Sequence, residues 1–193
     1  MTAVASRSGE LLNYSNIAQE VGVTVDTVKR WLAILQASGS VYLLQPYHHN
    51  HLKRAIKTPK LYMLDTGLMA YLTKWLTADT LQRGAKSGQF LETFVVGELL
   101  KSFYYQGVEP PMYFYRDTNQ REIDVIIEQN GVVYPLEIKS IANPDKKHGA
   151  VFKTLKEQLP ESEITVGTGV IINQYPKKMW LAEDLVALPI TYI

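Results

Sequence analysis

The 193-residue sequence contains no cysteine, which excludes disulfides, thiolate catalysis, iron–sulfur clusters and zinc ribbons. Any bound metal must therefore use carboxylate, carbonyl or imidazole groups, a set that favours a hard ion such as Mg²⁺ or Mn²⁺. The sequence also lacks an apolar run near the roughly 20 residues that a bilayer span needs, and its first residues lack the apolar centre of a secretion signal. These absences predict a cytoplasmic protein.

Charge of one sign is also scarce, because the formal net charge is only +1. A protein that binds nucleic acid tightly normally carries a strong basic excess, so this composition permits such binding without arguing for it. Hydrophobic residues make up 46% and charged residues 20% of the chain, which fits a globular protein of one largish or two small domains.

The first 83 residues predict a winged-helix domain. Residues 15–23 and 24–35 each carry apolar side chains at helical spacing, and Gly22 lies at the turn between them. Residues 41–45 and 60–64 are typical of two strands that flank a polar segment. A helix-turn-helix followed by a two-stranded wing is the winged-helix pattern.

Residues 84–193 predict a second domain. Residues 87–105 form a helix that is apolar nearly all round, which indicates burial between layers. Three strands follow at 112–116, 122–128 and 132–139, then an amphipathic helix and a buried strand near 168–173. This order predicts an α/β sandwich of the α+β class with a mixed central sheet.

Asn130-Gly131 is a strong signal for a two-residue hairpin turn, and it sets the pairing of the strands on either side. In that register Asp124 faces Glu137 and Glu122 faces Lys139. Because side chains alternate along a strand, all four charges are predicted on one face, and the other face is covered by Ile123, Val125, Ile127, Leu136 and Ile138.

Asp124 opposite Glu137 is unusual, because two carboxylates roughly 5 Å apart repel each other unless a cation lies between them. A divalent ion would resolve the repulsion, and Lys139 could then steady an attacking water or the charge that develops on a phosphate. The alternative is that the four charges decorate a solvated sheet face. That alternative explains the pairing of Glu122 with Lys139 and leaves Asp124 opposite Glu137 unexplained.

Glu92 and Glu98 lie among apolar residues of the helix at 87–105. A buried carboxylate needs a metal or a cation, so both are candidate members of the same site. For either glutamate, and more so for Glu98, a pairing with an arginine such as Arg116 or Arg121 is the alternative.

These residues resemble the PD-(D/E)xK nuclease superfamily. Gly88-Gln-Phe-Leu-Glu92, Arg121-Glu-Ile-Asp124 and Leu136-Glu-Ile-Lys-Ser140 are similar to its glycine-x-x-x-glutamate, aspartate and glutamate-x-lysine elements. The resemblance implies a restriction-endonuclease-like fold over residues 84–193 that binds magnesium and cleaves phosphodiester bonds. It also implies that Glu92, Asp124 and Glu137 are metal ligands and that Lys139 is the catalytic lysine.

A longer resemblance covers nearly the whole chain. The segments 9–14, 59–68, 90–100 and 115–117 are similar to the C-terminal region of predicted bacterial AAA-type ATPases, in which a winged helix and a nuclease-like domain follow an ATPase domain. The sequence has no G-x-x-x-x-G-K-[ST] phosphate loop, so it cannot hydrolyse ATP by that mechanism. We therefore expect a C-terminal fragment that is either a nuclease or a non-catalytic binding module for an attached ATPase.

Basic residues of the first domain are candidate contacts to DNA or RNA: Lys29 and Arg30 on the second helix, and Lys53, Arg54 and Lys57 in the predicted wing. Docking against a protein domain is the alternative for this winged helix.

Two further clusters favour solvated loops. His48, His49 and His51 have no acidic or cysteine partner nearby in sequence, which favours a polar, phosphate-contacting loop over a metal site. Residues 146–148, Lys-Lys-His, favour a solvated loop over a phosphate-facing edge.

Overall fold

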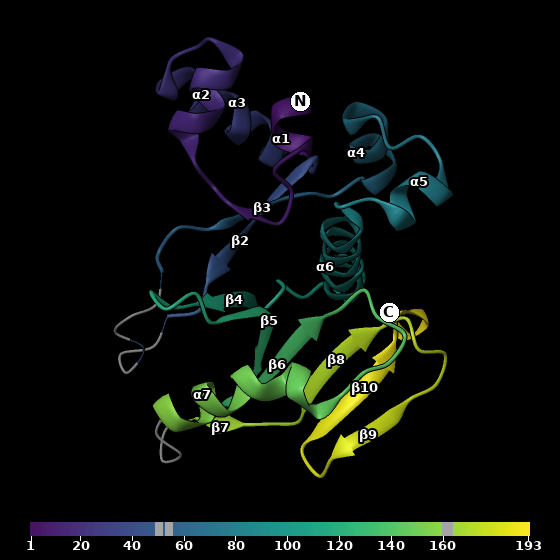
Figure 1. Cartoon of the computed structure of the whole chain (residues 1–193). Coiled ribbons are helices and arrows are strands. Elements are labelled where there is room, and N and C mark those ends of the chain that lie inside the picture. The colour runs from purple at the N-terminus through teal and green to yellow at the C-terminus, as the bar shows by residue number, and fades with distance from the viewer. Residues whose placement is uncertain (49–51, 53–55, 160–163) are drawn as a thin grey trace. The chain divides into compact units, whose positions relative to one another are not determined.

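The computed structural model describes residues 1–48, 52, 56–159 and 164–193 (Figure 1). Two compact units divide the chain. The first contains Met1–Leu44 and Thr58–Gly97, and the second contains Gln45–Lys57 and Glu98–Ile193. In the described part of the chain, no helix is both long and apolar enough to cross a membrane.

The first unit begins with three helices, α1 (Thr2–Ala5), α2 (Tyr14–Val21) and α3 (Val25–Ala37). The predicted helix, glycine turn and helix are confirmed at α2 and α3. Gly22 ends α2 with a φ of 74°, in the left-handed region that favours glycine. Thr24 caps α3, since its hydroxyl accepts a hydrogen bond from the Thr27 N–H.

The strands of the first unit form an antiparallel group, with β3 (Lys60–Met63) between β1 (Glu10–Leu11) and β2 (Val41–Pro46). The predicted strands at 41–45 and 60–64 are therefore confirmed. Their apolar side chains close a core with the first three helices, and its buried members are Ala3, Val4, Leu12, Ile17, Ala18, Val28, Leu32, Val41 and Leu61.

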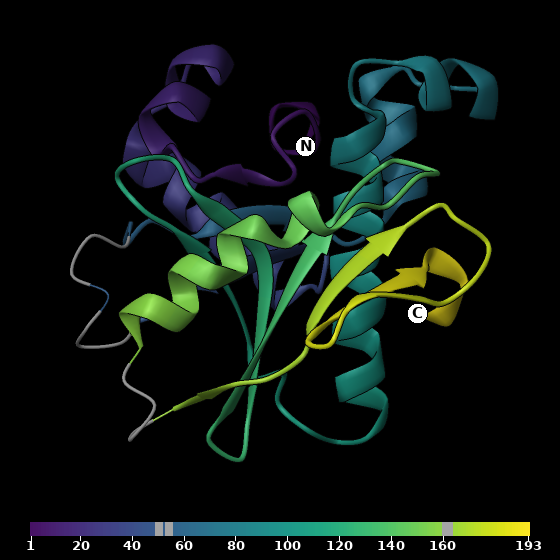
Figure 2. The same cartoon turned by 60° about the horizontal axis from the view of Figure 1, so that its bottom comes forward.

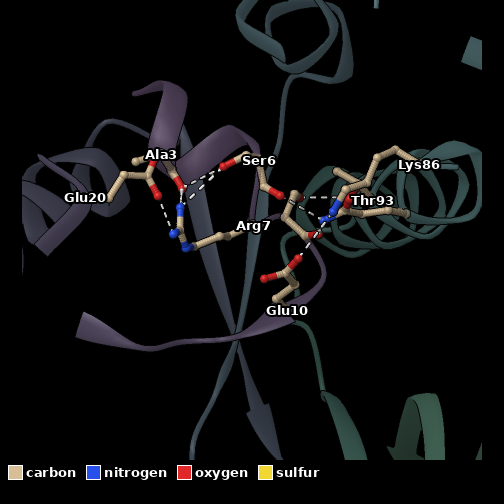
Figure 3. Close-up of polar contacts among 9 residues, drawn as sticks. Ala3, Ser6, Arg7, Glu10, Glu20, Lys86 and Thr93 are labelled. Carbon is tan, nitrogen blue, oxygen red and sulfur yellow. Dashed lines mark hydrogen bonds and ion pairs between the residues drawn. The ribbon is translucent and has the colours of Figure 1, made fainter. Parts of the chain in front are cut away.

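Polar contacts hold the segment after α1 in place (Figure 3). The Arg7 guanidinium donates to the Ala3 carbonyl at 2.8 Å and forms an ion pair with Glu20 of α2. Lys86 lies 3.4 Å from Glu10 of β1. The Thr93 hydroxyl lies 2.8 Å from that of Ser8, and both residues are fully buried. These contacts tie α1 and β1 to the helices around them.

Three more helices follow β3: α4 (Thr66–Thr73), α5 (Ala78–Arg83) and α6 (Ser87–Tyr105). The structure gives α6 the predicted bounds, but the predicted burial between layers holds for only part of its surface. Phe94, Tyr104 and Tyr105 are exposed, with 85% of Tyr105 open to solvent. The apolar composition of α6 thus exceeds what its buried face requires.

The second unit is built on a mixed sheet. Its strands are β4 (Met112–Arg116), β5 (Glu122–Gln129), β6 (Val132–Ile138), β8 (Gly169–Asn173), β10 (Leu185–Pro189) and β9 (Met179–Ala182), in that spatial order. The last two residues of β2 pair in parallel with β4, and the short β7 (Thr165–Val166) pairs with β6.

The predicted hairpin is confirmed. Gln129 pairs with Val132, and the register continues to Val125 opposite Leu136. Asn130 and Gly131 both have positive φ, at 53° and 75°, as a two-residue turn of this kind requires.

A 3₁₀ turn, η1 (Lys146–Gly149), leads into α7 (Ala150–Gln158), which lies on one face of the sheet (Figure 2). Phe152 and Leu155 of α7 pack with Ile126, Val133 and Ile171. The parallel pairing of β6 with β8 follows from this crossover helix. The element order α6, β4, β5, β6, α7, β8 confirms the predicted mixed α/β fold. The strands β9 and β10 were not predicted.

The two compact units do not divide where the sequence predicts a boundary, near residue 83. Residues 84–97 belong to the first unit, whose core includes Phe90 and Met69, and residues 45–57 belong to the second. The strand β2 and the helix α6 each contain residues of both units. The division into residues 1–83 and 84–193 stays a prediction about domains.

Two glycines of the first unit allow a matched test of the turn at Gly22. A Cβ at Gly22 or at Gly88 would have no neighbour within 4 Å, so the two sites differ in backbone conformation alone. We expect Gly22→Ala to lower the free energy of unfolding by about 1–2 kcal/mol through left-handed strain. Gly88→Ala, inside α6, should raise it by about 0.5–1 kcal/mol. Urea denaturation measures both, and equal effects would contradict the assignment.

Candidate metal and catalytic site

A β-bulge in β5 positions Asp124. Tyr115 pairs with Ile123 and Tyr113 pairs with Ile126, so Asp124 and Val125 together oppose the single residue between the two tyrosines. Bulges of this kind redirect side chains and are frequent beside active sites. The paired register between β5 and β6 ends at Val125, the residue that follows Asp124 in the sequence.

The Asp124 carboxylate accepts a hydrogen bond from the Ile138 N–H at 2.7 Å. Only 9% of the residue is exposed, so this bond satisfies an oxygen that is nearly excluded from water. The carboxylate therefore ties the bulge of β5 to the end of β6.

The bulge also corrects one prediction. Strict alternation along β5 puts Ile123 and Ile126 on opposite faces, yet both pack in the core cluster under α7. The prediction that Ile123, Val125 and Ile127 cover one face is therefore wrong, because the extra residue reverses the alternation between Ile123 and Ile126.

Glu137 is the last residue but one of β6, and only 4% of it is exposed. It pairs in parallel with Ile171 of β8. Its carboxylate lies 2.5 Å from the Lys139 Nζ. Burial and the nearby Asp124 carboxylate raise the pKa of Glu137 to about 8, although Lys139 acts in the opposite direction.

Lys139 follows β6 directly, and its backbone N–H donates to the Ile172 carbonyl at 2.9 Å. Its Nζ also lies 3.9 Å from Asp124, so one ammonium group serves two carboxylates. With 38% of its side chain exposed, Lys139 reaches from the buried pair to solvent. A buried acidic pair beside a partly exposed lysine is suited to holding a cation and donating to a bound anion.

The predicted third ligand has partners of its own. Glu92 lies on α6 in the first unit, where its carboxylate accepts hydrogen bonds from the Lys60 Nζ at 2.8 Å and the Tyr62 hydroxyl at 2.5 Å. Lys60 is only 2% exposed. Sequence reasoning missed both partners, because nothing in a short strand pattern marks a lysine as buried. The grouping of Glu92 with Asp124 and Glu137 stays a prediction.

The donor set fits a divalent ion in part. In residues 1–48, 52, 56–159 and 164–193, no three or more histidine or acidic residues gather as metal ligands. Asp124 and Glu137 alone would leave most of the coordination to backbone oxygen, water and substrate. Mg²⁺ commonly binds in this way, with one or two carboxylates and several waters.

Comparison with known proteins shows which family the chain belongs to. Residues 87–193, more than half of the chain, match the model of a domain of unknown function, DUF4143. The chain belongs to the DUF4143 family. Residues 1–79 match the model of a second domain of unknown function, DUF8612. The DUF4143 match contains Glu92, Asp124, Glu137 and Lys139.

Two curated relatives are similar over almost the whole chain. They are the uncharacterized protein Rv2008c of Mycobacterium tuberculosis and the uncharacterized protein Mb2031c of Mycobacterium bovis, each 27% identical over 188 residues. The match covers 97% of this chain and spans about two fifths (40%) of each relative. No solved structure matches.

The supporting acids of the DUF4143 domain have partners within the described residues. Glu98 forms an ion pair with Lys101, one turn along α6. The arginines considered as alternative partners pair with other acids, since Arg116 lies 3.1 Å from Glu122, across the β4–β5 ladder, and Arg121 lies 2.7 Å from Asp117. The side chains of Glu98 and Glu122 are half-buried.

The predicted nucleic-acid contacts are only partly described. Lys29 is exposed and lies 3.8 Å from Asp26, and Arg30 and Lys57 are exposed. Lys53 and Arg54 lie outside the described residues, as do His49 and His51 of the histidine cluster. Their role in binding stays a prediction.

The raised pKa of Glu137 predicts a pH-dependent stability. The folded protein keeps a proton that the unfolded chain loses above pH 4.5, so this contribution is full below pH 4.5 and is lost as the pH rises through about 8. Without divalent ions, the free energy of unfolding should fall over this range. Glu137→Gln should flatten the profile, whereas Glu109→Gln, in an exposed loop, should not. Urea titrations at several pH values measure this, and parallel wild-type and Glu137→Gln profiles would contradict it.

Proposed function

We propose that this chain carries a metal-dependent, PD-(D/E)xK nuclease-like domain that cleaves phosphodiester bonds of DNA or RNA. The observation that carries the proposal is the gathering of Asp124, Glu137 and Lys139 at the ends of two neighbouring strands. The order of helix, three strands, helix and strand also agrees with the α/β sandwich predicted from the sequence.

Asp124 and Glu137 would hold Mg²⁺ or Mn²⁺, which supplies Lewis-acid polarisation of a phosphoryl oxygen. The hydrogen bond from the Ile138 N–H fixes one oxygen of Asp124, and a carboxylate has further lone pairs that a metal ion would use. The burial of Glu137 favours a cation beside it, because a second negative charge there is costly without one.

Lys139 would act on the substrate. Its ammonium group has three donors, and its partly exposed side chain can turn from Glu137 towards a phosphate. There it would orient the attacking water or stabilise the charge that develops on a phosphate oxygen.

The first unit would bind the substrate or a partner. Its helix pair α2–α3 and the antiparallel β2–β3 are consistent with a winged helix, and Lys29 and Arg30 are exposed on α3. Lys57, which belongs to the second unit, is exposed as well. Since the curated relatives are much longer than this chain, we also propose that it is the C-terminal part of an AAA-type ATPase.

A non-catalytic module that binds nucleic acid or protein for an attached ATPase is the second candidate. Two observations favour it. Glu92 already has a cation, Lys60, within hydrogen-bonding distance, and only two acidic residues gather at the candidate site in the described part of the chain. A fold of this kind can keep its charges after its chemistry is lost.

Cleavage assays test the first candidate. With Mg²⁺ or Mn²⁺, we expect the protein to cut single- or double-stranded DNA or RNA. Asp124→Asn and Lys139→Met should each lower the rate by about 100-fold or more, since each removes a group that acts on the transition state. Glu109→Gln should leave the rate unchanged. Cleavage that survives both site substitutions would come from another site or a contaminant.

Metal binding separates the two candidates without any substrate. Calorimetry should detect Mn²⁺ binding to the wild type, and Glu137→Ala should abolish it. Lys139→Met should keep or strengthen binding, because it removes a positive charge that competes with the ion. Absence of Mn²⁺ binding to the wild type would favour the non-catalytic module.

A further inference from the structure

The second unit contains a cavity of about 460 Å³ that the candidate catalytic residues do not line. It lies among η1, the first turns of α7, the β7–β8 connection and the β9–β10 turn. Figure 2 shows these segments on and beside the face of the sheet that α7 covers. Its volume falls within the range of roughly 300–1,000 Å³ that small-molecule sites occupy.

The charged side chains that line the cavity are Lys146, Lys147, Lys153, Lys156, Asp145 and Asp184. Both acids have lysine partners. Lys147 lies 3.7 Å from Asp145, and Lys156 lies 2.7 Å from Asp184.

The other two lysines that line the cavity are Lys146 and Lys153. Neither forms an ion pair with any residue that the structure describes, and both are exposed at the cavity. Four lysines against two acids leave two positive charges for a ligand, although the whole chain carries only +1. A group with two negative charges would balance them.

Apolar residues form part of the cavity lining, which is called its floor below. They are Phe152 and Leu185, both buried, together with Val166, Gly167 and Gly169. A Cβ at Gly169 would overlap the Phe152 ring, so the backbone lies directly against the aromatic side chain there. A flat apolar body could rest on this surface while its charged group meets the lysines at the rim.

We propose that this cavity binds a nucleotide, with its phosphate between Lys146 and Lys153 and its base on the floor beside Phe152. A phosphate monoester carries a charge of about −1.5 to −2 at neutral pH, which matches the two excess lysines. A base has an apolar face suited to such a floor, and its stacking is tolerant of sequence. The nucleotide is either free or one unit of a strand, and the site is separate from the proposed cleavage site.

The test is binding of AMP and of a fluorescent single-stranded oligonucleotide to the whole chain, in the presence of a chelator. The double variant Lys146→Gln, Lys153→Gln should weaken binding by about tenfold or more, the loss expected for two charge-assisted contacts. Lys177→Gln, exposed and outside the cavity, is the matched control and should bind as the wild type does.

A second variant tests the base rather than the phosphate. Ala182 lines the cavity from β9 and is exposed, so Ala182→Trp should fill the floor without disturbing the fold. It should abolish nucleotide binding while the thermal unfolding temperature stays unchanged. Inorganic phosphate should bind at least tenfold more weakly than AMP, about 1.4 kcal/mol, because it lacks the base.

A free nucleotide and a nucleotide within a strand are expected to give different results in this binding assay. If a free nucleotide is the ligand, AMP binds and displaces the oligonucleotide. If a strand is the ligand, the oligonucleotide binds and AMP competes only weakly. The proposal is overturned if neither binds, if the lysine variant binds as the wild type does, or if polyglutamate competes as well as the oligonucleotide.

The outcome is independent of cleavage. Asp124→Asn should keep nucleotide binding even though it should abolish the proposed nuclease activity. Loss of cleavage with binding intact would therefore leave this site standing, and loss of binding in the lysine variant would leave the chemistry at Asp124 and Glu137 untouched.

Discussion

Two nearly buried carboxylates share one lysine, and this imbalance of charge is the main electrostatic constraint on the second unit. Asp124 and Glu137 cannot both be ionised there at low cost, since Lys139 compensates only one negative charge. Either a proton or a cation must resolve the conflict, and the raised pKa of Glu137 favours a proton there when no cation is bound. A purely structural role would be met more cheaply by apolar residues at these positions.

Much of this arrangement could be predicted from the sequence. Asn130-Gly131 determines the turn, and the turn determines the register. Extending that register predicts that Asp124 lies near Glu137. The helix pair at α2 and α3 could be predicted because Gly22 and Thr24 encode their own conformations locally. Predictions succeeded where a short segment contains the determinant of its own structure.

The rest depends on contacts between distant segments. The bulge at Asp124 arises from the pairing of β5 with β4, and no residue type in β5 marks it. The burial of Lys60 against Glu92 joins residues 32 apart in the sequence. The ion pair of Glu98 with Lys101 is local, because the two residues are three apart on one helix, and this spacing alone could have predicted it.

The bulge makes the acidic pair sensitive to any insertion or deletion in β5. The one extra residue in β5 shifts every earlier side chain of the strand to the opposite face. A single-residue deletion there would therefore change the residue that pairs with Tyr115. It would also move the Asp124 carboxylate away from the Ile138 N–H. Substitutions can alter the site gradually, but a change in chain length would remove it in one step. The acidic pair thus depends on residue count as much as on residue identity.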